Sequence, residues 1–167
     1  MQAFTRTLYR LLAHPEYIEP LRQEVESVIA KEGWTRAGMD QMHKIDSFVR
    51  ETQRVDVPIT GSSYSFPFFV AQSLIFLPSF CLVGLNRLTL RPFTFSNGMT
   101  IPAGTTLALP VHSIHMDEEI YPNAQEFDGF RFLKLREKKG DDVLETRHQL
   151  VNATAELLGF GCGRHAW

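Results

Sequence analysis

The sequence predicts an α+β fold, with helices in the first third of the chain and short strands after them. Three observations lead to this prediction. Apolar residues recur at helical spacing up to about residue 55, strand-type alternation flanks Asn97-Gly98, and an uncharged segment separates the two regions. We therefore expect a helical segment over 1–56, an apolar insert over 57–83 and a region of β-hairpin and loops over 84–167.

Three helices are predicted in the first region. The apolar positions of the first are Phe4, Leu8, Leu11 and Leu12. His14-Pro15 ends or kinks it, because proline cannot continue the helical hydrogen bonds. The second helix ends at Gly33 and has an apolar stripe of Ile18, Leu21, Val25, Val28 and Ile29. The third spans 42–55, with Met42, Ile45, Phe48, Val49 and Val55 on one side.

The uncharged segment runs from Val57 to Asn86, 30 residues without Asp, Glu, Lys or Arg. Its densest part, 66–85, contains 14 apolar residues in 20, which is long enough to cross a bilayer as a helix. Two prolines weaken a spanning helix, and the many phenylalanines and β-branched residues also suit strands. Both interpretations stay open from composition alone.

Beyond Arg87 the pattern favours β-structure. Phe93–Ile101 forms two alternating runs around Asn-Gly, which predicts a hairpin, and a turn is expected over 102–104. Residues 105–111 are predicted to form a buried strand. Residues 112–132 are expected to be loop-like, and a charged loop is expected over 134–147.

The composition excludes several classes of protein. The chain has 167 residues, 17 Lys+Arg against 19 Asp+Glu and a net charge of −2, so no electrostatic case exists for nucleic-acid binding. A hydrophobic content of 44% argues against general disorder. Two cysteines, Cys81 and Cys162, cannot form a disulfide scaffold.

Charged and metal-binding residues offer few clear candidate sites. Glu51 and Arg54 are three apart on the third predicted helix and can pair. The helical wheel places both away from the apolar stripe, as a solvated ion pair worth about 0–1 kcal/mol would be. A zinc site at Cys162 and His165 lacks a second pair of ligands.

The glycine cluster near residue 160 is the most informative local feature. Gly159, Gly161 and Gly163 let the backbone bend tightly and approach a ligand closely. Arg164 and His165 then supply cationic or hydrogen-bonding groups, as an anionic cofactor requires. A flexible tail is the alternative interpretation.

Taken in order, these segments resemble the C-terminal half of a cytochrome P450, most like the fungal microsomal type. The similarity excludes only 57–83. The matching segments are Leu12-Ala-His-Pro-Glu16, Glu51-Thr-Gln-Arg54, the hairpin and turn over 95–105, His115-Met-Asp117, Tyr121-Pro-Asn123, Phe127-Asp-Gly-Phe-Arg131-Phe132, and the haem-loop-like Phe160-Gly-Cys-Gly163-Arg-His165-Ala.

The resemblance implies a haem iron held by a cysteine thiolate, which supports insertion of one oxygen atom from O2 into an organic substrate. It also implies a buried structural triad of Glu51, Arg54 and Arg131, which overrules the helical-wheel interpretation. The cofactor-binding residues that it implies are Phe160, Gly161, Gly163 and His165, with His165 bonding a haem propionate.

Three departures from the family pattern shape the functional prediction. Trp167 stands at the thiolate position, and an indole has no basic lone pair for iron, so no metal ligand is expected. Cys162 lies five positions too early to replace it. The family's oxygen-activating helix, and the helix after the haem loop, fall outside the 167 residues, so a fragment without activity of its own is expected.

The third departure is the segment 57–83, which family members lack. Joining Asp56 directly to Gly84 restores the family's length, and every valine codon begins with GT, the usual splice donor, which suits Val57. The segment is therefore interpreted as translated intron or another gene-model artefact, with a membrane segment as the alternative.

The prediction for function is thus a fragment of a haem-dependent monooxygenase. By resemblance, its partners are an NADPH-dependent cytochrome P450 reductase and a small organic substrate, at the endoplasmic reticulum membrane. The alternative is a small non-catalytic membrane-associated protein anchored by residues 66–85.

Overall fold

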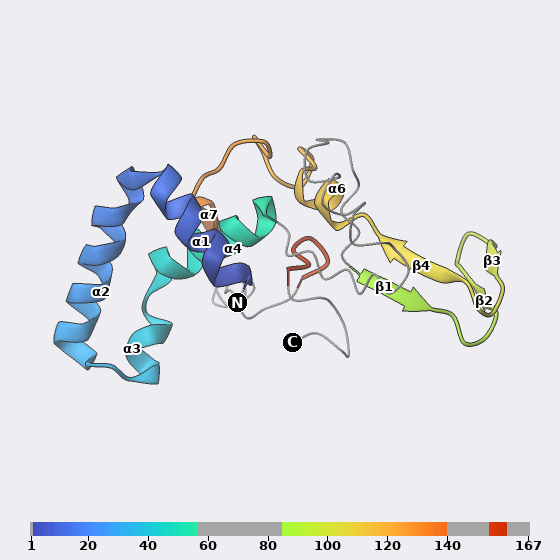
Figure 1. The fold of residues 1–167 in the computed structure, drawn as a ribbon, viewed down its shortest axis with the longest axis horizontal. Coiled ribbons are helices and arrows are strands. Elements are labelled where there is room, and N and C mark those ends of the chain that lie inside the picture. Colours follow the sequence, from blue (N-terminus) through green and yellow to red (C-terminus); the bar gives the residue numbers. More distant parts are fainter. Residues whose placement is uncertain (1, 57–84, 140–153, 160–167) are drawn as a thin grey trace.

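Helix α4 (His43–Val55) occupies the centre of the helical part of the molecule. Packed against it are α1 (Gln2–Ala13), α2 (Ile18–Glu32), α6 (Val111–His115) and α7 (Arg131–Lys139). The computed structural model describes residues 2–56, 85–139 and 154–159. In Figure 1 the helices gather at one end, and two small antiparallel sheets form an arm at the other. The mixed α+β class predicted from the sequence is confirmed.

Helices α1 (Gln2–Ala13) and α2 (Ile18–Glu32) end where the sequence predicts. The structure adds two short elements that were not predicted, the 3-10 turn η1 (Pro15–Tyr17) and helix α3 (Arg36–Asp40). Pro15 begins η1, where no backbone N–H donor is needed. Gly33 ends α2 with a φ of 68°, and its N–H donates to the carbonyl of Ile29 at 3.0 Å.

The carboxylates of Glu24 and Asp56 bond the two ends of α4 to neighbouring helices. Glu24 of α2 accepts hydrogen bonds from the amides of Lys44 and Ile45 at 2.8 and 3.0 Å, where a helix N-terminus favours negative charge. Asp56, just after α4, accepts two hydrogen bonds from Arg10 of α1 at 2.6 and 2.8 Å. This hydrogen bonding raises the pKa of Arg10. The position of α4 is therefore set by its two neighbouring helices.

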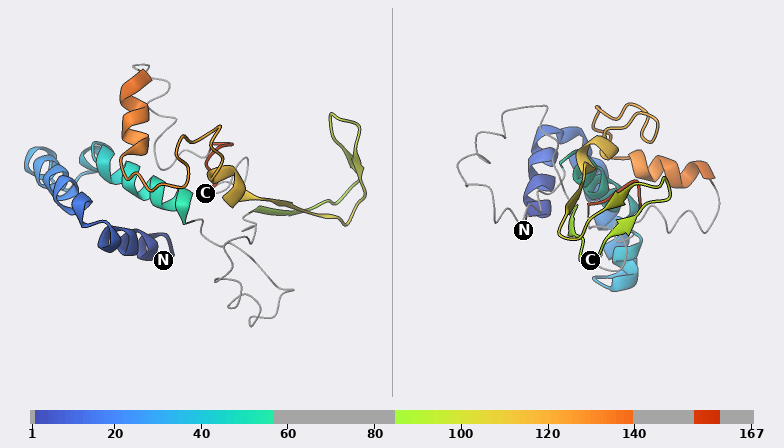
Figure 2. Two further views of the ribbon diagram at one scale, coloured as in Figure 1. Left: turned by 90° about the horizontal axis from the view of Figure 1, so that it is seen from above. Right: turned by 90° about the vertical axis from the view of Figure 1, so that its right-hand side faces the viewer.

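The strands form a hairpin arm, as the Asn-Gly signal predicts. β1 (Leu85–Leu88) pairs with β4 (Thr106–Leu109), and β2 (Phe93–Thr94) pairs with β3 (Thr100–Ile101). Gly98 and Gly104 take φ values of 85° and 82° at the two turns. The left view in Figure 2 shows this arm extending away from the helices.

The prediction of a buried strand over 105–111 is wrong in two respects. Three of the four β4 residues are exposed, because within the described residues β4 has only β1 beside it and no second layer covers the pair. Val111 belongs instead to helix α6 (Val111–His115). It is 1% exposed there, packed with Leu158.

The loops predicted over 112–132 and 134–147 are also wrong where α6 and α7 (Arg131–Lys139) form. Leucine, lysine, arginine and glutamate favour helices. Tertiary contacts then fix α7, since Phe132 is buried against Tyr121 and Arg136 forms an ion pair with Asp46 of α4. Of the second loop, only 134–139 lies within the described residues, and it is helical.

An aromatic cluster closes the space between η1, α4 and the chain before α7. Phe48 lies 5.4 Å from Tyr17 and 5.4 Å from Phe127, measured between ring centroids. Gly129 sits against these rings, and its amide donates to the hydroxyl of Tyr17 at 3.2 Å. A side chain at residue 129 would overlap the rings, because an added Cβ would meet Phe48 Cδ2 at 2.6 Å and Tyr17 Cε1 at 2.9 Å.

Gly129→Ala is therefore expected to lower the free energy of unfolding by about 1–3 kcal/mol, the usual cost of overpacking a filled core. Urea unfolding of the full chain, followed by far-UV circular dichroism, measures the loss. Gly98→Ala is the control, because residue 98 has positive φ but no heavy atom within 4 Å of the added Cβ, so it reports backbone strain without a clash. An unfolding midpoint for Gly129→Ala equal to that of the natural chain would contradict the packing argument.

Within the three described ranges, no helix is both long and apolar enough to cross a membrane. The predicted insert 57–83 lies outside the described residues, as does the anchor candidate 66–85 except for Leu85.

Candidate functional site

The structure brings Glu51, Arg54 and Arg131 together at one carboxylate. Arg54 forms a two-point ion pair with Glu51, from Nε to Oε2 and from Nη2 to Oε1, both at 2.8 Å. Arg131 of α7 donates from Nε to Oε1 of Glu51 at 3.1 Å. The backbone amide of Asp128 also donates to Oε1, at 3.2 Å. Residues 80 positions apart in the sequence thus share one acceptor.

This cluster is buried, so the interpretation of Glu51 and Arg54 as a solvated surface pair is wrong. Both side chains are 0% exposed, and that of Arg131 is 11% exposed. The stripe predicted for α4 also fails to identify its buried face. Neighbours on several sides bury a largely polar set: Ser47, Phe48, Arg50, Glu51, Thr52, Gln53 and Arg54.

The two arginines hold the chain between α6 and α7 by its carbonyl groups. Arg54 donates from Nη1 to the carbonyl of His115 at 2.6 Å and from Nη2 to that of Glu126 at 3.2 Å. Arg131 donates to the carbonyls of Pro122, Asn123 and Glu126. Burial of these charges is tolerated because ion pairs and hydrogen bonds replace the lost water.

His115 joins the cluster to the segment 154–159. Its Nδ1 lies 3.0 Å from the carbonyl oxygen of Arg54, and its Nε2 accepts from the backbone amide of Leu158 at 3.0 Å. Burial lowers the pKa of His115 to about 4, with Arg54 and His112 adding to the shift by charge repulsion. The ring is therefore neutral at physiological pH.

The segment 154–159 lies against α4 and directly precedes the haem-loop-like sequence 160–166, the glycine-rich loop. Leu157 and Leu158 are buried, and an added Cβ at Gly159 would meet Oε1 of Gln53 at 2.9 Å. This contact places the segment against the Gln53 side chain of α4. The predicted cofactor contacts Phe160, Gly161, Gly163 and His165 lie outside the described residues, as do Cys162 and Trp167.

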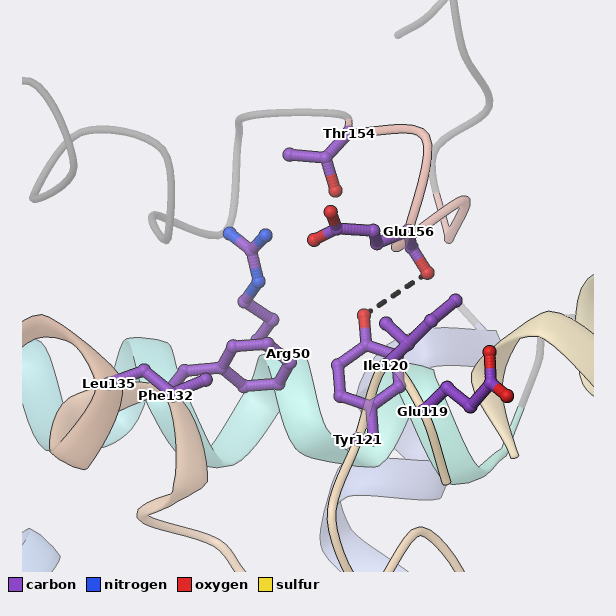
Figure 3. A pocket seen from close by; sticks show the side chains of 8 residues that line it. All are labelled: Arg50, Glu119, Ile120, Tyr121, Phe132, Leu135, Thr154 and Glu156. Atoms are coloured by element: carbon purple, nitrogen blue, oxygen red, sulfur yellow. Dashed lines mark hydrogen bonds between the residues drawn. The ribbon is translucent and has the colours of Figure 1, made fainter. Parts of the chain in front are cut away.

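A cavity of about 310 Å³ opens beside this segment. Figure 3 shows Arg50 rising from α4 next to Phe132, and Tyr121 pointing to the backbone of Glu156. The hydroxyl of Tyr121 donates to the carbonyl of Glu156 at 3.1 Å, and the guanidinium of Arg50 lies 4.7 Å from the centre of the Phe132 ring. The other lining residues are Glu119, Ile120, Leu135 and Thr154.

Burial also changes the acidity of two groups in this cavity. Desolvation lowers the pKa of Arg50 to about 10 and raises that of Tyr121 to about 12. Arg50 therefore stays a cation and Tyr121 a neutral hydroxyl near neutral pH. In the described part of the chain, no group of three His, Cys, Asp or Glu residues is placed to hold a metal ion. The zinc alternative at Cys162 and His165 lies outside that part.

Sequence reasoning missed the site roles of His115 and Arg50. The resemblance placed His115 in the matching segment His115-Met-Asp117 but implied no role for its side chain. That position in the motif order was the available signal. Arg50 gave no signal, since it lies in a helix and is followed by four other polar residues, 51–54.

Comparison with known proteins identifies the family to which the chain is similar. Residues 2–62 and 78–166 match the family model described as Cytochrome P450. Cytochrome P450 monooxygenase 151 of Postia placenta (strain ATCC 44394 / Madison 698-R) is 40% identical over 163 residues, which are 98% of this chain and 28% of that protein. Cytochrome P450 monooxygenase terQ of Tolypocladium album is 38% identical over 99% of this chain and 25% of its own length.

A further relative has a similar identity and coverage. Cytochrome P450 monooxygenase 103 of Postia placenta is 38% identical over 97% of this chain and 27% of that protein. The chain therefore spans about a quarter of the length of these curated relatives.

Proposed function

Because the chain belongs to the cytochrome P450 family, we propose that it is part of a haem-dependent monooxygenase, an enzyme that inserts one oxygen atom from O2 into an organic substrate. The observation that carries the proposal is the buried Glu51–Arg54–Arg131 cluster. It anchors the chain before α7 and, through His115, the backbone that leads into the glycine-rich loop. A loop that binds a cofactor requires the backbone before it to be held in one position.

In this proposal Glu51, Arg54 and Arg131 are structural residues and touch no substrate. Phe160, Gly161 and Gly163 would shape the loop against the haem, and His165 would bond a propionate through a charge-assisted contact. When bound, haem supplies the oxygen chemistry of the family. The role of these residues is to bind it and to fix its orientation.

The donor set does not fit iron ligation by this chain. Trp167 stands at the family's thiolate position, and its indole nitrogen donates a hydrogen bond but offers no lone pair to a metal. We therefore propose that these 167 residues hold no thiolate-ligated iron and do not turn over substrate. No catalytic step is assigned to any residue in the chain.

The other parts of the proposal follow from family membership. The protein to which this chain corresponds would take electrons from an NADPH-dependent cytochrome P450 reductase and act on a small organic substrate at the endoplasmic reticulum membrane. The segment 57–83 would be an insert that is either translated intron or another gene-model artefact. The family match leaves out residues 63–77, in the middle of this segment, which supports an insert there. If the segment is native, 66–85 is the candidate membrane anchor.

The test is haem reconstitution of the full 167-residue chain, followed by the absorption spectrum of the reduced, CO-bound form. We expect no red-shifted Soret band of the thiolate-ligated type, because the position that should carry the thiolate is an indole. Such a band in the natural chain would overturn the proposal of a missing ligand. Cys162→Ala is the matched variant, since loss of a band in it would identify Cys162 as the ligand.

A further inference from the structure

His115 is held in one tautomer by two backbone groups. The amide of Leu158 can only donate, so the Nε2 atom that faces it at 3.0 Å carries no proton. The ring is neutral, and its proton therefore sits on Nδ1, which donates to the carbonyl of Arg54 at 3.0 Å. The side chain is 0% exposed, so water does not compete for either bond.

His115 and Arg54 also bond each other's backbone. Arg54 donates from Nη1 to the carbonyl of His115 at 2.6 Å, while His115 donates to the carbonyl of Arg54. This reciprocal pair locks the end of α4 to the end of α6. Only Nε2 of His115 is left to reach a third segment, and it holds Leu158.

We propose that His115 is a positioning residue that fixes the backbone entering the glycine-rich loop through its bond to Leu158, and that protonation of the ring releases this backbone. The inference concerns the chain's own backbone and does not depend on haem binding or on monooxygenase activity. Its failure would remove the link through His115 but leave in place the family match and the Glu51–Arg54–Arg131 geometry on which the proposed function rests.

Release follows from the chemistry of the site. A protonated imidazole carries N–H groups on both nitrogens, so Nε2–H would face the N–H of Leu158 and two donors would oppose each other. The charged or titratable groups that act on the ring are Arg54 of α4, which Glu51 pairs, and His112 of α6. Arg54 and His112 both disfavour a second positive charge here.

The direction of the pH effect follows from linkage. Burial places the pKa of folded His115 at about 4, below its ordinary value of 6.5. The state in which neutral His115 bonds the Leu158 amide is therefore fully favoured above pH 6.5. Its stability relative to the released state decreases as the pH falls from 6.5 toward 4. In that window the protection of the Leu158 amide against hydrogen exchange should fall by up to about tenfold per pH unit. The Gly33 amide, which donates to the carbonyl of Ile29 at the end of α2, is the reference for acid effects that do not involve His115.

The first measurement is the 15N chemical shifts of the His115 ring in the full chain at neutral pH. We expect the Nδ1–H tautomer, with protection of the Leu158 amide declining more steeply with acid than that of Gly33. An Nε2–H tautomer, titration of His115 at its ordinary pKa, or equal decline at Leu158 and Gly33 would overturn the proposal. These readouts use the natural chain, so they hold even where a variant fails to fold.

Variants of His115 separate the effect of its hydrogen bond to Leu158 from the effect of the space that its ring fills. His115→Gln keeps an oxygen acceptor for Leu158 but does not titrate, so Leu158 should stay protected and its protection should no longer fall between pH 6.5 and 4. His115→Phe fills the space without an acceptor and should lose at least tenfold of the protection at neutral pH. His14→Gln, which replaces a histidine before η1 that is not among the groups acting on the His115 ring, is the control and should leave the steep acid decline in place. A decline in His115→Gln like that of the natural chain would refute the release mechanism.

Discussion

Replacing Glu51 with alanine is expected to lower the free energy of unfolding by about 3–5 kcal/mol, the cost of leaving a buried charge without its partner. The carboxylate accepts hydrogen bonds from Arg54, Arg131 and the amide of Asp128, and all three donors would lose their acceptor. Since Arg54 is 0% exposed, water cannot replace the carboxylate there. Urea unfolding of the full chain, followed by far-UV circular dichroism, measures the loss.

Glu19→Ala is the matched control for this experiment. Glu19 pairs with Arg22 at the same three-residue spacing on α2, but the two side chains are 65% and 61% exposed. Its loss should lower the free energy of unfolding by about 1 kcal/mol or less, because surface ion pairs contribute little. Equal losses in the two variants would show that burial of the Glu51 carboxylate contributes nothing to stability.

The contrast between the buried pair of Glu51 and the exposed pair of Glu19 also explains why the sequence pattern predicted the wrong buried face for α4. Periodicity assumes that the apolar face of a helix is the buried one. On α4 the residues Ile45, Val49 and Val55 are only partly buried, while Glu51 and Arg54 are fully buried. Their partners are Arg131 and the carbonyl of His115, which lie 80 and 61 residues away along the chain. A local pattern carries no information about contacts at that distance.

Features governed by local backbone chemistry were predicted well. Pro15 marks the start of η1, Gly33 ends α2, and the Asn-Gly pair lies in the turn between β2 and β3. In each case the residue type limits the backbone to a few conformations, whatever the rest of the chain does. Helix α7 was missed for the opposite reason. Its highly charged sequence is typical of a loop, and the contacts that stabilise the helix are made by Phe132 and Arg136 with residues outside it.

The candidate cluster was predicted by motif order rather than by physical pattern. The resemblance named Glu51, Arg54 and Arg131 as a triad, and the three side chains meet at distances of 2.8–3.1 Å. It said nothing about the carbonyl groups that the two arginines hold, or about the backbone bonds of His115. Those contacts depend on how the chain between α6 and α7 folds, which no motif specifies.

Replacing Phe48 with alanine is expected to lower the free energy of unfolding by about 3–5 kcal/mol, the usual range for removing a buried aromatic ring. Phe48 is 1% exposed and contacts Tyr17 and Phe127 at ring distances of 5.4 Å. It also covers Gly129, whose Cα faces the ring. Loss of the ring would open a cavity where η1, α4 and the chain before α7 meet, since the backbone of α4 is held at both ends and cannot close it.

Phe93→Ala is the control for Phe48→Ala, because it removes the same atoms from an exposed site. Phe93 lies on β2 in the hairpin arm, is 54% exposed and contacts Phe95 at a ring distance of 5.1 Å. Its removal should lower the free energy of unfolding by about 1 kcal/mol or less, since little apolar surface returns to water. A loss for Phe93→Ala as large as that for Phe48→Ala would place the cooperative core in the arm. The buried aromatic cluster would then not be what holds α4 against the chain that carries Arg131.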